Sequence, residues 1–286
     1  MLTNSISVVV PTFNRLKLLQ RALTSIFSQT LLPSEVLVVD DGSDDGTSDW
    51  INQSNYDVRL LTQKNLGVSA ARNLGIRNAS SNWIALLDSD DEWLPEKLTK
   101  QVASLSEKSV LCHTDEIWVR NNVQVNAHNK HRKRGGFIFQ HCLPLCAISP
   151  SSSLIKRSLF DEVGFFDESL PACEDYDLWL KICSRHPVDY IDQPLLVKYG
   201  GHDDQLSRKH WGMDRFRIQA MENLLMTAPL TDEQKNQTLM MMRKKLNVFL
   251  GGAKKRGNKE AVAKWTVKLN WVEDQLTHEN GDGFEN

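Results

Sequence analysis

Four carboxylates stand within five positions of one another, directly after an apolar run. The stretch IALLDSDDEW (84–93) places Asp88, Asp90, Asp91 and Glu92 behind four apolar residues. Like charges at this spacing repel one another, so a cation is needed to compensate them. Residues two apart in a strand project to the same side, so Asp88 and Asp90 can face one ligand. The spacing predicts a site in which carboxylates and substrate phosphate oxygens hold Mg²⁺ or Mn²⁺.

Three other interpretations of the acidic stretch are less well supported. An EF-hand loop needs Gly where Trp93 stands and Glu where Thr99 stands. A strand ending in DxD is also typical of haloacid-dehalogenase-type phosphotransferases, but these have Thr where this chain has Glu92. Capping of a helix that starts near Pro95 accounts for Asp91 or Glu92, but not for all four acids.

The elements that position these acids follow an alternating pattern. Apolar strand patterns at 6–10, 36–39, 58–61 and 83–87 alternate with helical patterns at 16–27, from about 47, and at 69–78. This alternation predicts an α/β fold with a mostly parallel sheet covered on both faces. Polar stretches follow three of the strands: PTFN (11–14), DDGSDDGT (40–47) and DSDDEW (88–93). Because open sheets of this kind bind ligands beyond the carboxyl ends of their strands, we expect the three stretches to form one site.

The second half of the chain is predicted to be less regular and then helical. We expect hairpins and loops over 108–139, strands at 151–155, 188–191 and 195–199, and a helix at 175–185. Helices follow at 213–226, 231–250 and 259–276; the second opens with a Thr231/Gln234 capping box and ends at Gly251-Gly252. The domain prediction is a catalytic unit over 1–204, a helical extension over 205–278 and a disordered tail over 279–286.

Composition excludes several classes of protein. The chain has 286 residues, 41% of them hydrophobic, which is enough for a sizeable core. A formal net charge of −2 does not indicate that the chain as a whole binds nucleic acid, so any basic surface must be local. Neither a membrane span nor a signal peptide is evident. Five cysteines without a CxxC pair favour a reduced, cytoplasmic chain, and the HCLPLC stretch (141–146) does not have zinc-site spacing. GxGxxG and GxxxxGK[ST] are both missing, so metal and side chains must hold any phosphate.

Six stretches in order resemble the successive motifs of family 2 glycosyltransferases with the GT-A fold. They are VVVPTFNR (8–15), ALTSIFSQT (22–30), EVLVVDDGSDDGT (35–47), NLGVSAARNLGI (65–76), WIALLDSDDEWLPEKL (83–98) and CEDYDLWLK (173–181). The resemblance covers about the first 200 residues. It implies an inverting enzyme that moves a sugar from a nucleotide diphosphate to an acceptor hydroxyl.

The resemblance also implies roles for individual residues. Pro11, Thr12 and Phe13 match the pocket for the nucleobase and ribose, and Asp41 matches the acid that hydrogen-bonds the nucleobase. Asn65 matches the loop before Arg72, and Arg72 matches a basic residue near the nucleobase and diphosphate. Asp88 with Ser89 matches the ribose and metal region, Asp90 matches the metal ligand, and His202 matches a further group at the metal or diphosphate. A carboxylate that accepts from a pyrimidine N–H suits a UDP or dTDP sugar. A turn residue at Thr12, a solvated arginine at Arg72 and a surface histidine at His202 remain alternatives.

The second acidic pair, Glu174-Asp175, precedes the helix in CEDYDLWLK. Inverting transfer is a direct displacement, so it needs a base on the acceptor side and a stabilised leaving group on the other. By the resemblance Asp175 is the base and Glu174 a supporting or acceptor-binding residue. Helix capping is the alternative, because both acids stand at a helix start.

The carboxy-terminal helices lie outside the resemblance. Residues 243–268 carry nine Lys or Arg against one Glu, a local net charge of +8. Such a run is a solvated face or a contact with anionic lipid at the inner membrane surface, where lipid-linked acceptors are found. The expected partners are a nucleotide sugar, a carbohydrate or lipid-linked acceptor and a second copy of the chain, but no nucleic acid.

Two rival functions remain, a catalytically silent nucleotide-sugar-binding protein and a sugar-phosphate nucleotidyltransferase.

Overall fold

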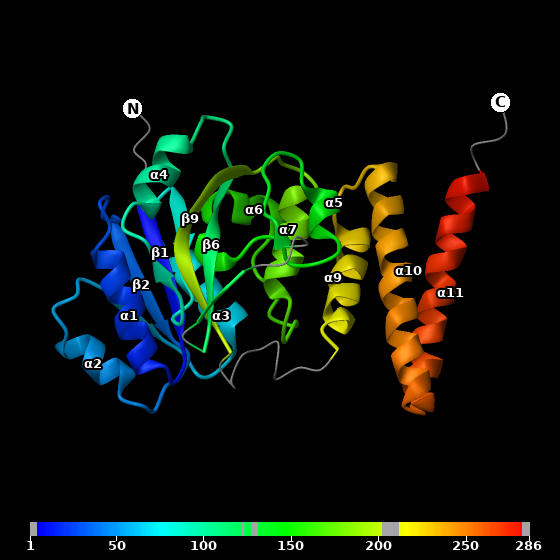
Figure 1. Cartoon of the computed structure of the whole chain (residues 1–286), viewed down its shortest axis with the longest axis horizontal. Helices are drawn as coiled ribbons and strands as arrows, with labels where there is room; N and C mark the ends of the chain where they lie inside the picture. Colours follow the sequence, from blue (N-terminus) through cyan, green and yellow to red (C-terminus); the bar gives the residue numbers. More distant parts are fainter. Residues whose placement is uncertain (1–4, 122, 127–130, 202–211, 282–286) are drawn as a thin grey trace.

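The computed structural model describes residues 5–121, 123–126, 131–201 and 212–281 (Figure 1). One twisted sheet runs through the first 200 residues, with strand order β3-β2-β1-β4-β8-β6-β9-β5 and β7 paired to β6. Its strands are β1 (Ile6–Thr12), β2 (Glu35–Asp40), β3 (Arg59–Thr62), β4 (Trp83–Leu86), β5 (Glu92–Trp93), β6 (Leu111–Arg120), β7 (Val123–Val125), β8 (Leu154–Lys156) and β9 (Asp189–Gly200). Helices cover the sheet, which confirms the predicted α/β fold.

Four parallel strands bring the polar stretches to one edge of the sheet. β1 pairs in parallel with β2 and β4, and β2 with β3. The registers Thr12↔Asp40 and Asp40↔Thr62 make the carboxyl ends of β1, β2 and β3 level. The backbone N–H of Leu87 donates to the carbonyl of Val9, so the acidic stretch leaves the sheet beside PTFN. The three stretches therefore do meet, as their positions after parallel strands predict.

The other half of the sheet is mixed and differs from the sequence prediction in three places. Residues 150–152 form the 3₁₀ helix η2 (Pro150–Ser152), so only the end of the predicted strand 151–155 becomes β8. The predicted strands 188–191 and 195–199 are one strand, β9, parallel to β6. Within 108–139 the predicted hairpin forms between β6 and β7, but β6 is ten residues long and also joins the central sheet by pairing with β8 and β9.

The two faces of β1 and β2 bury alternate residues in separate cores. Val8, Val10, Val36 and Val38 pack with α1 (Leu16–Phe27) on one face. Val9, Leu37 and Val39 pack on the other face with α3 (Val68–Asn78) and α7 (Glu174–Cys183). The shorter helices are α2 (Thr47–Gln53), α4 (Lys97–Ser104), α5 (Phe139–Cys142) and α6 (Leu159–Val163). Burial on both faces explains why these strands read as continuous apolar runs.

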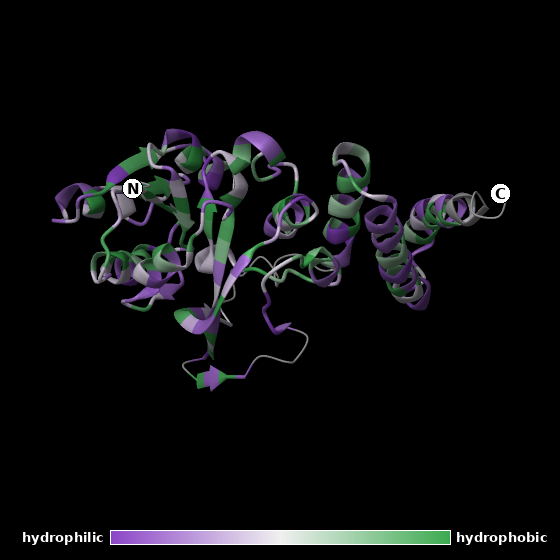
Figure 2. Cartoon of the chain, turned by 90° about the horizontal axis from the view of Figure 1, so that it is seen from above, coloured by the Kyte–Doolittle hydropathy of each residue, from purple (hydrophilic) through white to green (hydrophobic). Residues whose placement is uncertain are grey.

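Three helices follow the sheet and extend away from it. α9 (Asp214–Thr227) packs on α7, α10 (Asp232–Lys255) on α9, and α11 (Lys259–Gly281) on α10, so that α11 is outermost (Figure 1). The Thr231/Gln234 capping box is confirmed, but α10 continues through Gly251 and Gly252 and is longer than predicted. Seen from above, hydrophilic and hydrophobic residues are interspersed along α10 and α11 (Figure 2). Of the helices in the described ranges, none is both long and apolar enough to cross a membrane.

Candidate functional site

A cavity of about 780 Å³ lies beyond the carboxyl ends of β1, β2 and β4. It is lined by Pro11, Thr12, Phe13, Arg15, Asp41, Asn65, Gly67, Val68, Ala71, Arg72, Asp88, Ser89, Asp90, Asp91, Pro150, Ala172, Cys173, Glu174, Asp175, Lys198, Tyr199 and Met213. Eleven of the twelve residues predicted for the site are among them. The twelfth, His202, lies outside the described residues.

Arg72 joins the two acidic parts of the site. Its Nη1 donates to Glu174 Oε1 at 2.7 Å and its Nη2 to Asp88 Oδ1 at 2.6 Å, and only 4% of its side chain is exposed. Burial lowers the pKa of Arg72, but the two carboxylates outweigh it and raise the pKa. The guanidinium therefore stays charged and fixes the acidic stretch against the start of α7. A solvated arginine on a helix face, the alternative left open by the sequence, does not describe this residue.

Asp88 and Asp90 each pair with an arginine through one carboxylate oxygen. Asp88 Oδ1 accepts from Arg72, and Asp90 Oδ2 accepts from Arg15 Nη1 at 3.0 Å. Burial by itself raises the pKa of both carboxyls. At Asp88 the charge of Arg72 outweighs burial, so the pKa is lowered. At Asp90 burial and the charge of Asp88 together outweigh Arg15, so the pKa is raised. Among the described residues, no side chain hydrogen-bonds to Asp88 Oδ2 or Asp90 Oδ1.

The two open oxygens fit a divalent cation that takes its remaining ligands from substrate phosphate and water. The side chains are 25% and 14% exposed, so both are open to the cavity. Within the part of the chain that the structure describes, no three His, Cys, Asp or Glu side chains are grouped as a complete metal site. A cation here would therefore depend on the ligands that a substrate brings.

Asp91 and Glu92 tie the acidic stretch to β9 and η2. Asp91 Oδ2 accepts from Ser151 Oγ at 2.6 Å, its Oδ1 accepts from the backbone N–H of Tyr199 at 3.2 Å, and Glu92 Oε2 accepts from Tyr199 Oη at 2.8 Å. Burial and the charge of Asp90 raise the pKa of Asp91 well above its usual value. These two acids hold the loop in place, and neither caps α4, whose cap residue is Glu96.

Thr12 and Asp41 differ in how far their hydrogen bonds are satisfied. Thr12 Oγ1 is buried beside the cavity and has no hydrogen-bond partner in the described ranges. Asp41 accepts at Oδ1 from Gln63 Nε2 (2.7 Å) and the Leu66 N–H (2.8 Å), and at Oδ2 from the Gly67 N–H (2.9 Å). A carboxylate has about four acceptor sites, so Oδ2 of Asp41 can accept one further N–H.

Glu174 and Asp175 open α7 and point to different partners. Cys173 precedes them with φ 65°, a left-handed conformation that turns the chain into the helix. Glu174 pairs with Arg72, and burial together with the charge of Asp175 raises its pKa. Asp175 Oδ1 accepts from the N–H of Tyr176 at 2.7 Å, and its Oδ2 lies 3.0 Å from Cys146 Sγ. The N-cap residue Cys173 makes no side-chain cap, but both acids stand in the first turn of α7 and Asp175 accepts one of its N–H groups, so the helix-start role left open by the sequence is present here.

Of the eleven lining residues that were not predicted as site residues, three carry a cationic or hydroxyl group. Arg15 pairs with Asp90, Tyr199 bonds to Glu92, and Lys198 Nζ donates to Ser149 Oγ at 3.1 Å. Burial lowers the pKa of Lys198, but Glu116, Asp91 and Asp88 outweigh it and raise the pKa. Arg15 carried one usable signal, since it directly follows PTFN; Lys198 and Tyr199 reach the site only through the pairing of β9.

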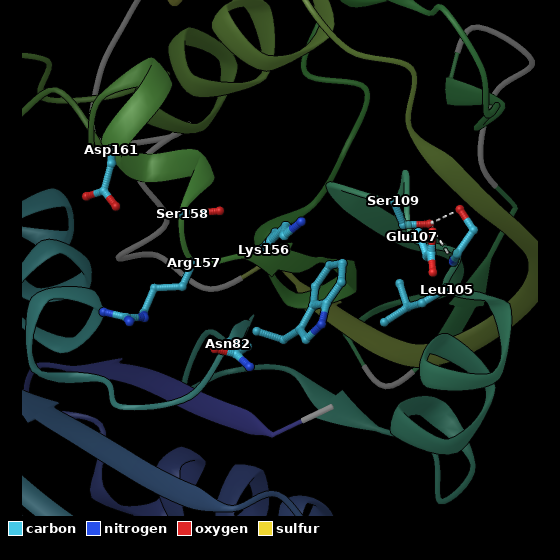
Figure 3. A pocket seen from close by; sticks show the side chains of 10 residues that line it. Asn82, Leu105, Glu107, Ser109, Lys156, Arg157, Ser158 and Asp161 are labelled. Carbon is cyan, nitrogen blue, oxygen red and sulfur yellow. Dashed lines mark hydrogen bonds between the residues drawn. The ribbon is translucent and has the colours of Figure 1, made fainter. Parts of the chain in front are cut away.

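A second pocket, of about 340 Å³, lies at the amino end of β4 and so at the opposite edge of the sheet. It is lined by residues of three segments, 82–83, 105–109 and 156–161. Its charged side chains Glu107, Lys156, Arg157 and Asp161 do not converge on one point (Figure 3). We therefore assign the chemistry to the larger cavity.

The family model for glycosyl transferase family 2 matches residues 7–164. An uncharacterised glycosyltransferase of Rickettsia bellii (strain RML369-C) is 31% identical over 222 residues, which cover 71% of this chain and 31% of the relative. WfgD of Escherichia coli, a UDP-Glc:alpha-D-GlcNAc-diphosphoundecaprenol beta-1,3-glucosyltransferase, is 28% identical over 190 residues, 65% of this chain and 73% of WfgD. The chain spans about a third of the length of three Rickettsia relatives.

Solved structures share the fold. S. aureus TarS 1–349 in complex with UDP-GlcNAc has a TM-score of 0.68 and 20% identity over 85% of this chain and 73% of that one. The mannosyltransferase PcManGT from Pyrobaculum calidifontis, in complex with GDP-Man and Mn²⁺, has a TM-score of 0.61 and 18% identity over 96% of this chain and 84% of that one. The fold is thus that of the GT-A type, and the chain belongs to glycosyl transferase family 2.

Proposed function

We propose that the protein transfers a sugar from a nucleotide diphosphate sugar, of the UDP or dTDP type, to an acceptor hydroxyl with inversion at the anomeric carbon. The observation that carries the proposal is that one cavity is lined both by the Asp88/Asp90 pair and by Asp175. Donor-binding acids and a base must be within reach of one sugar, and a shared cavity meets that requirement. The donor complexes of TarS and the donor named for WfgD, UDP-GlcNAc and UDP-Glc, support the UDP type.

In the proposed mechanism Asp175 accepts the proton of the acceptor hydroxyl while the oxygen of that hydroxyl bonds to the anomeric carbon. The bond from that carbon to the diphosphate oxygen breaks in the same step, and the diphosphate leaves with the electron pair. Asp88 and Asp90 would hold Mn²⁺ or Mg²⁺, which would act as a Lewis acid toward the departing diphosphate. Arg15 keeps Asp90 oriented, and Arg72 holds Glu174 beside the proposed catalytic base, Asp175. Oδ2 of Asp41 accepts a hydrogen bond from an N–H of the nucleobase, and Thr12 Oγ1 is available to the ribose or the nucleobase.

The test is a thermal-shift panel of nucleotide diphosphates and nucleotide sugars, with and without Mn²⁺, on the wild type and Asp90→Ala. A ligand that binds the folded state raises its stability by mass action. We expect a uridine or thymidine diphosphate to stabilise the wild type only with the metal, and to lose that effect in Asp90→Ala. Thermal shifts that do not depend on Mn²⁺, or no thermal shift across the panel, would contradict the proposal. Proton NMR of the transferred sugar's anomeric centre would then test inversion.

We further propose that residues 1–204 form the catalytic unit and that 205–278 support the acceptor side or a homodimer. The acceptor would be carbohydrate or lipid-linked, as in the name of WfgD, in cell-surface polysaccharide assembly. Within the basic run, Arg243, Lys244, Lys254, Lys255 and Lys259 are exposed, which favours a cytoplasmic protein that contacts the inner face of the membrane. Flotation with anionic liposomes at moderate salt should recover the protein; absence from the lipid fraction would remove the membrane contact.

A further inference from the structure

Cys146 lies against the carboxylate that we propose as the base. Its Sγ is 3.0 Å from Asp175 Oδ2 and 3.2 Å from the carbonyl oxygen of Ile148. The other carboxylate oxygen, Oδ1, accepts from the N–H of Tyr176 at 2.7 Å. Each oxygen of Asp175 therefore has a donor beside it, one from its own helix and one from a residue 29 positions earlier. A thiol carries one proton, and the charged oxygen is the stronger of its two acceptors.

The thiol keeps that proton at neutral pH. Burial and the negative charge of Asp175 raise the pKa of Cys146 well above its usual value, against a smaller opposing effect of Lys198. A thiolate beside a carboxylate would repel it, whereas a neutral thiol donates to it. Cys146 therefore acts here as a hydrogen-bond donor and not as a nucleophile.

The segment that carries Cys146, residues 143–149, is held from three directions. Tyr176 Oη on α7 donates to the carbonyl of Leu143 at 2.7 Å. Lys245 Nζ on α10 donates to the carbonyl of Pro144 at 2.8 Å, and Lys198 Nζ on β9 donates to Ser149 Oγ at 3.1 Å. Because α7, α10 and β9 all bind this short segment, the position of the thiol is set by the fold and not by the contact with Asp175 alone.

We propose that Cys146 is a positioning residue for transfer: its thiol fixes the orientation of the Asp175 side chain by donating a hydrogen bond to Oδ2. The inference rests on the proposed function, because it assigns Cys146 a part in the step that Asp175 performs there. The remaining lone pairs of Asp175 stay available for the acceptor hydroxyl, since a carboxylate has about four acceptor sites.

The charged and titratable groups around the pair come from three elements. Cys173 precedes α7, Glu174 and Tyr176 adjoin Asp175 on it, Lys198 faces Cys146 from β9, and Arg217 and Asp214 of α9 lie near Cys173. None of them is changed by a substitution at Cys146, so a change in kcat of such a variant reports on the contact between the thiol and Asp175.

The kinetic test compares Cys146→Ala, which removes the donor, with Cys146→Ser, which keeps one. For Cys146→Ala we expect kcat to fall by about tenfold, as for loss of one hydrogen bond to a charged group, with the KM for the donor sugar unchanged. Cys146→Ser, which keeps a donor, should restore kcat. Full activity in Cys146→Ala, a loss of the same size in both variants, or a loss that lies in the donor KM and not in kcat would overturn the proposal.

A second measurement needs no substrate and so separates this inference from the proposed function. The rate at which N-ethylmaleimide alkylates Cys146 at about pH 8 is followed by mass spectrometry in the wild type and in Asp175→Asn. Removal of the neighbouring charge should raise the thiolate fraction and speed alkylation severalfold at Cys146. Cys112, whose pKa is raised by burial and not by Asp175, is the internal control. Equal rates at Cys146 would overturn the contact, whatever the enzyme transfers; if no transfer is found while alkylation responds, only the proposed function fails.

Discussion

Arg72 is the residue on which the geometry of the site depends most directly. It is 3% exposed, and its two Nη atoms pair with acids that lie 102 and 16 positions away in the chain. A planar fork can serve two carboxylates at once, whereas an ammonium group on a flexible stem holds one point contact well. The identity of this cation, and not only its charge, therefore sets the distance between the acidic stretch and α7.

We expect Arg72→Lys to lower the free energy of unfolding by about 2 kcal/mol or more, because one buried carboxylate loses its partner. The matched control is Arg77→Lys on the same helix. Arg77 is about half exposed and lies 3.8 Å from Glu168, so its replacement should cost less than about 0.5 kcal/mol. Urea unfolding of both variants measures the difference; equal costs would show that the Arg72 fork is not needed for the fold.

Lys97 makes stability depend on pH. Its side chain is fully buried, bonds Gln101 Oε1 at 2.7 Å, and has its Nζ 4.1 Å from the centre of the Trp93 ring. Burial lowers the pKa of Lys97 to about 7, against a smaller opposing effect of Cys112. Between about pH 7 and pH 10 the unfolded chain binds more protons at this position than the folded one, so stability must rise with pH.

The expected outcome is that wild-type stability, relative to Lys97→Met, grows by a few kcal/mol as the pH rises from about 7 to about 10. Denaturant midpoints of the two proteins at four pH values give this difference directly. A difference that does not change with pH would show that the ammonium form is accommodated in the fold.

Helix α3 must approach β1 closely for Arg72 to reach Asp88, and a glycine permits it. A Cβ added at Gly75 would meet Val9 Cγ1 at 2.4 Å and Val39 Cγ2 at 3.1 Å. Both valines belong to the strands whose ends form the site. A methyl group here would have to push the helix off the sheet or distort the strands.

Gly75→Ala should therefore destabilise the protein by about 1–3 kcal/mol and weaken nucleotide binding. Gly251→Ala is the matched change in another helix: a Cβ at Gly251 would meet nothing within 4 Å, and Ala should stabilise α10 by about 0.5–1 kcal/mol. Thermal unfolding with and without UDP measures both effects. The same sign for the two variants would contradict the packing argument.

At the scale of the whole molecule, Lys245 connects the helical extension to the site. From α10 its Nζ bonds the carbonyl of Pro144 at 2.8 Å and Asp214 Oδ1 at 2.9 Å, and 9% of its side chain is exposed. Pro144 lies two residues before Cys146. The extension thereby holds the segment 143–149 together with β9, whose Lys198 bonds Ser149.

Lys245→Met should lower the free energy of unfolding by about 1–3 kcal/mol, since two acceptors lose their donor, and should lower kcat more than donor binding. The control is Lys244→Met, an exposed neighbour that should be close to neutral. Calorimetric unfolding and transfer rates for the pair give the comparison. If Lys245→Met changed stability alone, the extension would be only a structural support.

The sequence by itself determined the parallel half of the sheet and the acids at its edge, because period and strand length are local properties of apolar runs buried on both faces. It failed where packing opposed local preference. Gly251 and Gly252 were expected to end α10, but the packing of α10 against α9 and α11 outweighs a cost of about 1 kcal/mol for each glycine. Two strands were expected at 188–191 and 195–199, but β9 is continuous, because register shifts in its pairing with β6 accommodate Pro194, which has no N–H.

Only the tertiary structure decided which groups surround the acids. Arg15 and Asp90 are 75 residues apart, Tyr199 and Asp91 are 108 apart, and Cys146 meets Asp175 through a segment fixed from three elements. No local pattern encodes such distances, since they follow from strand order and helix packing across the whole sheet. The sequence thus determined which residues have the chemistry of the proposed transfer site, while the fold determined which cations and donors hold those residues in place.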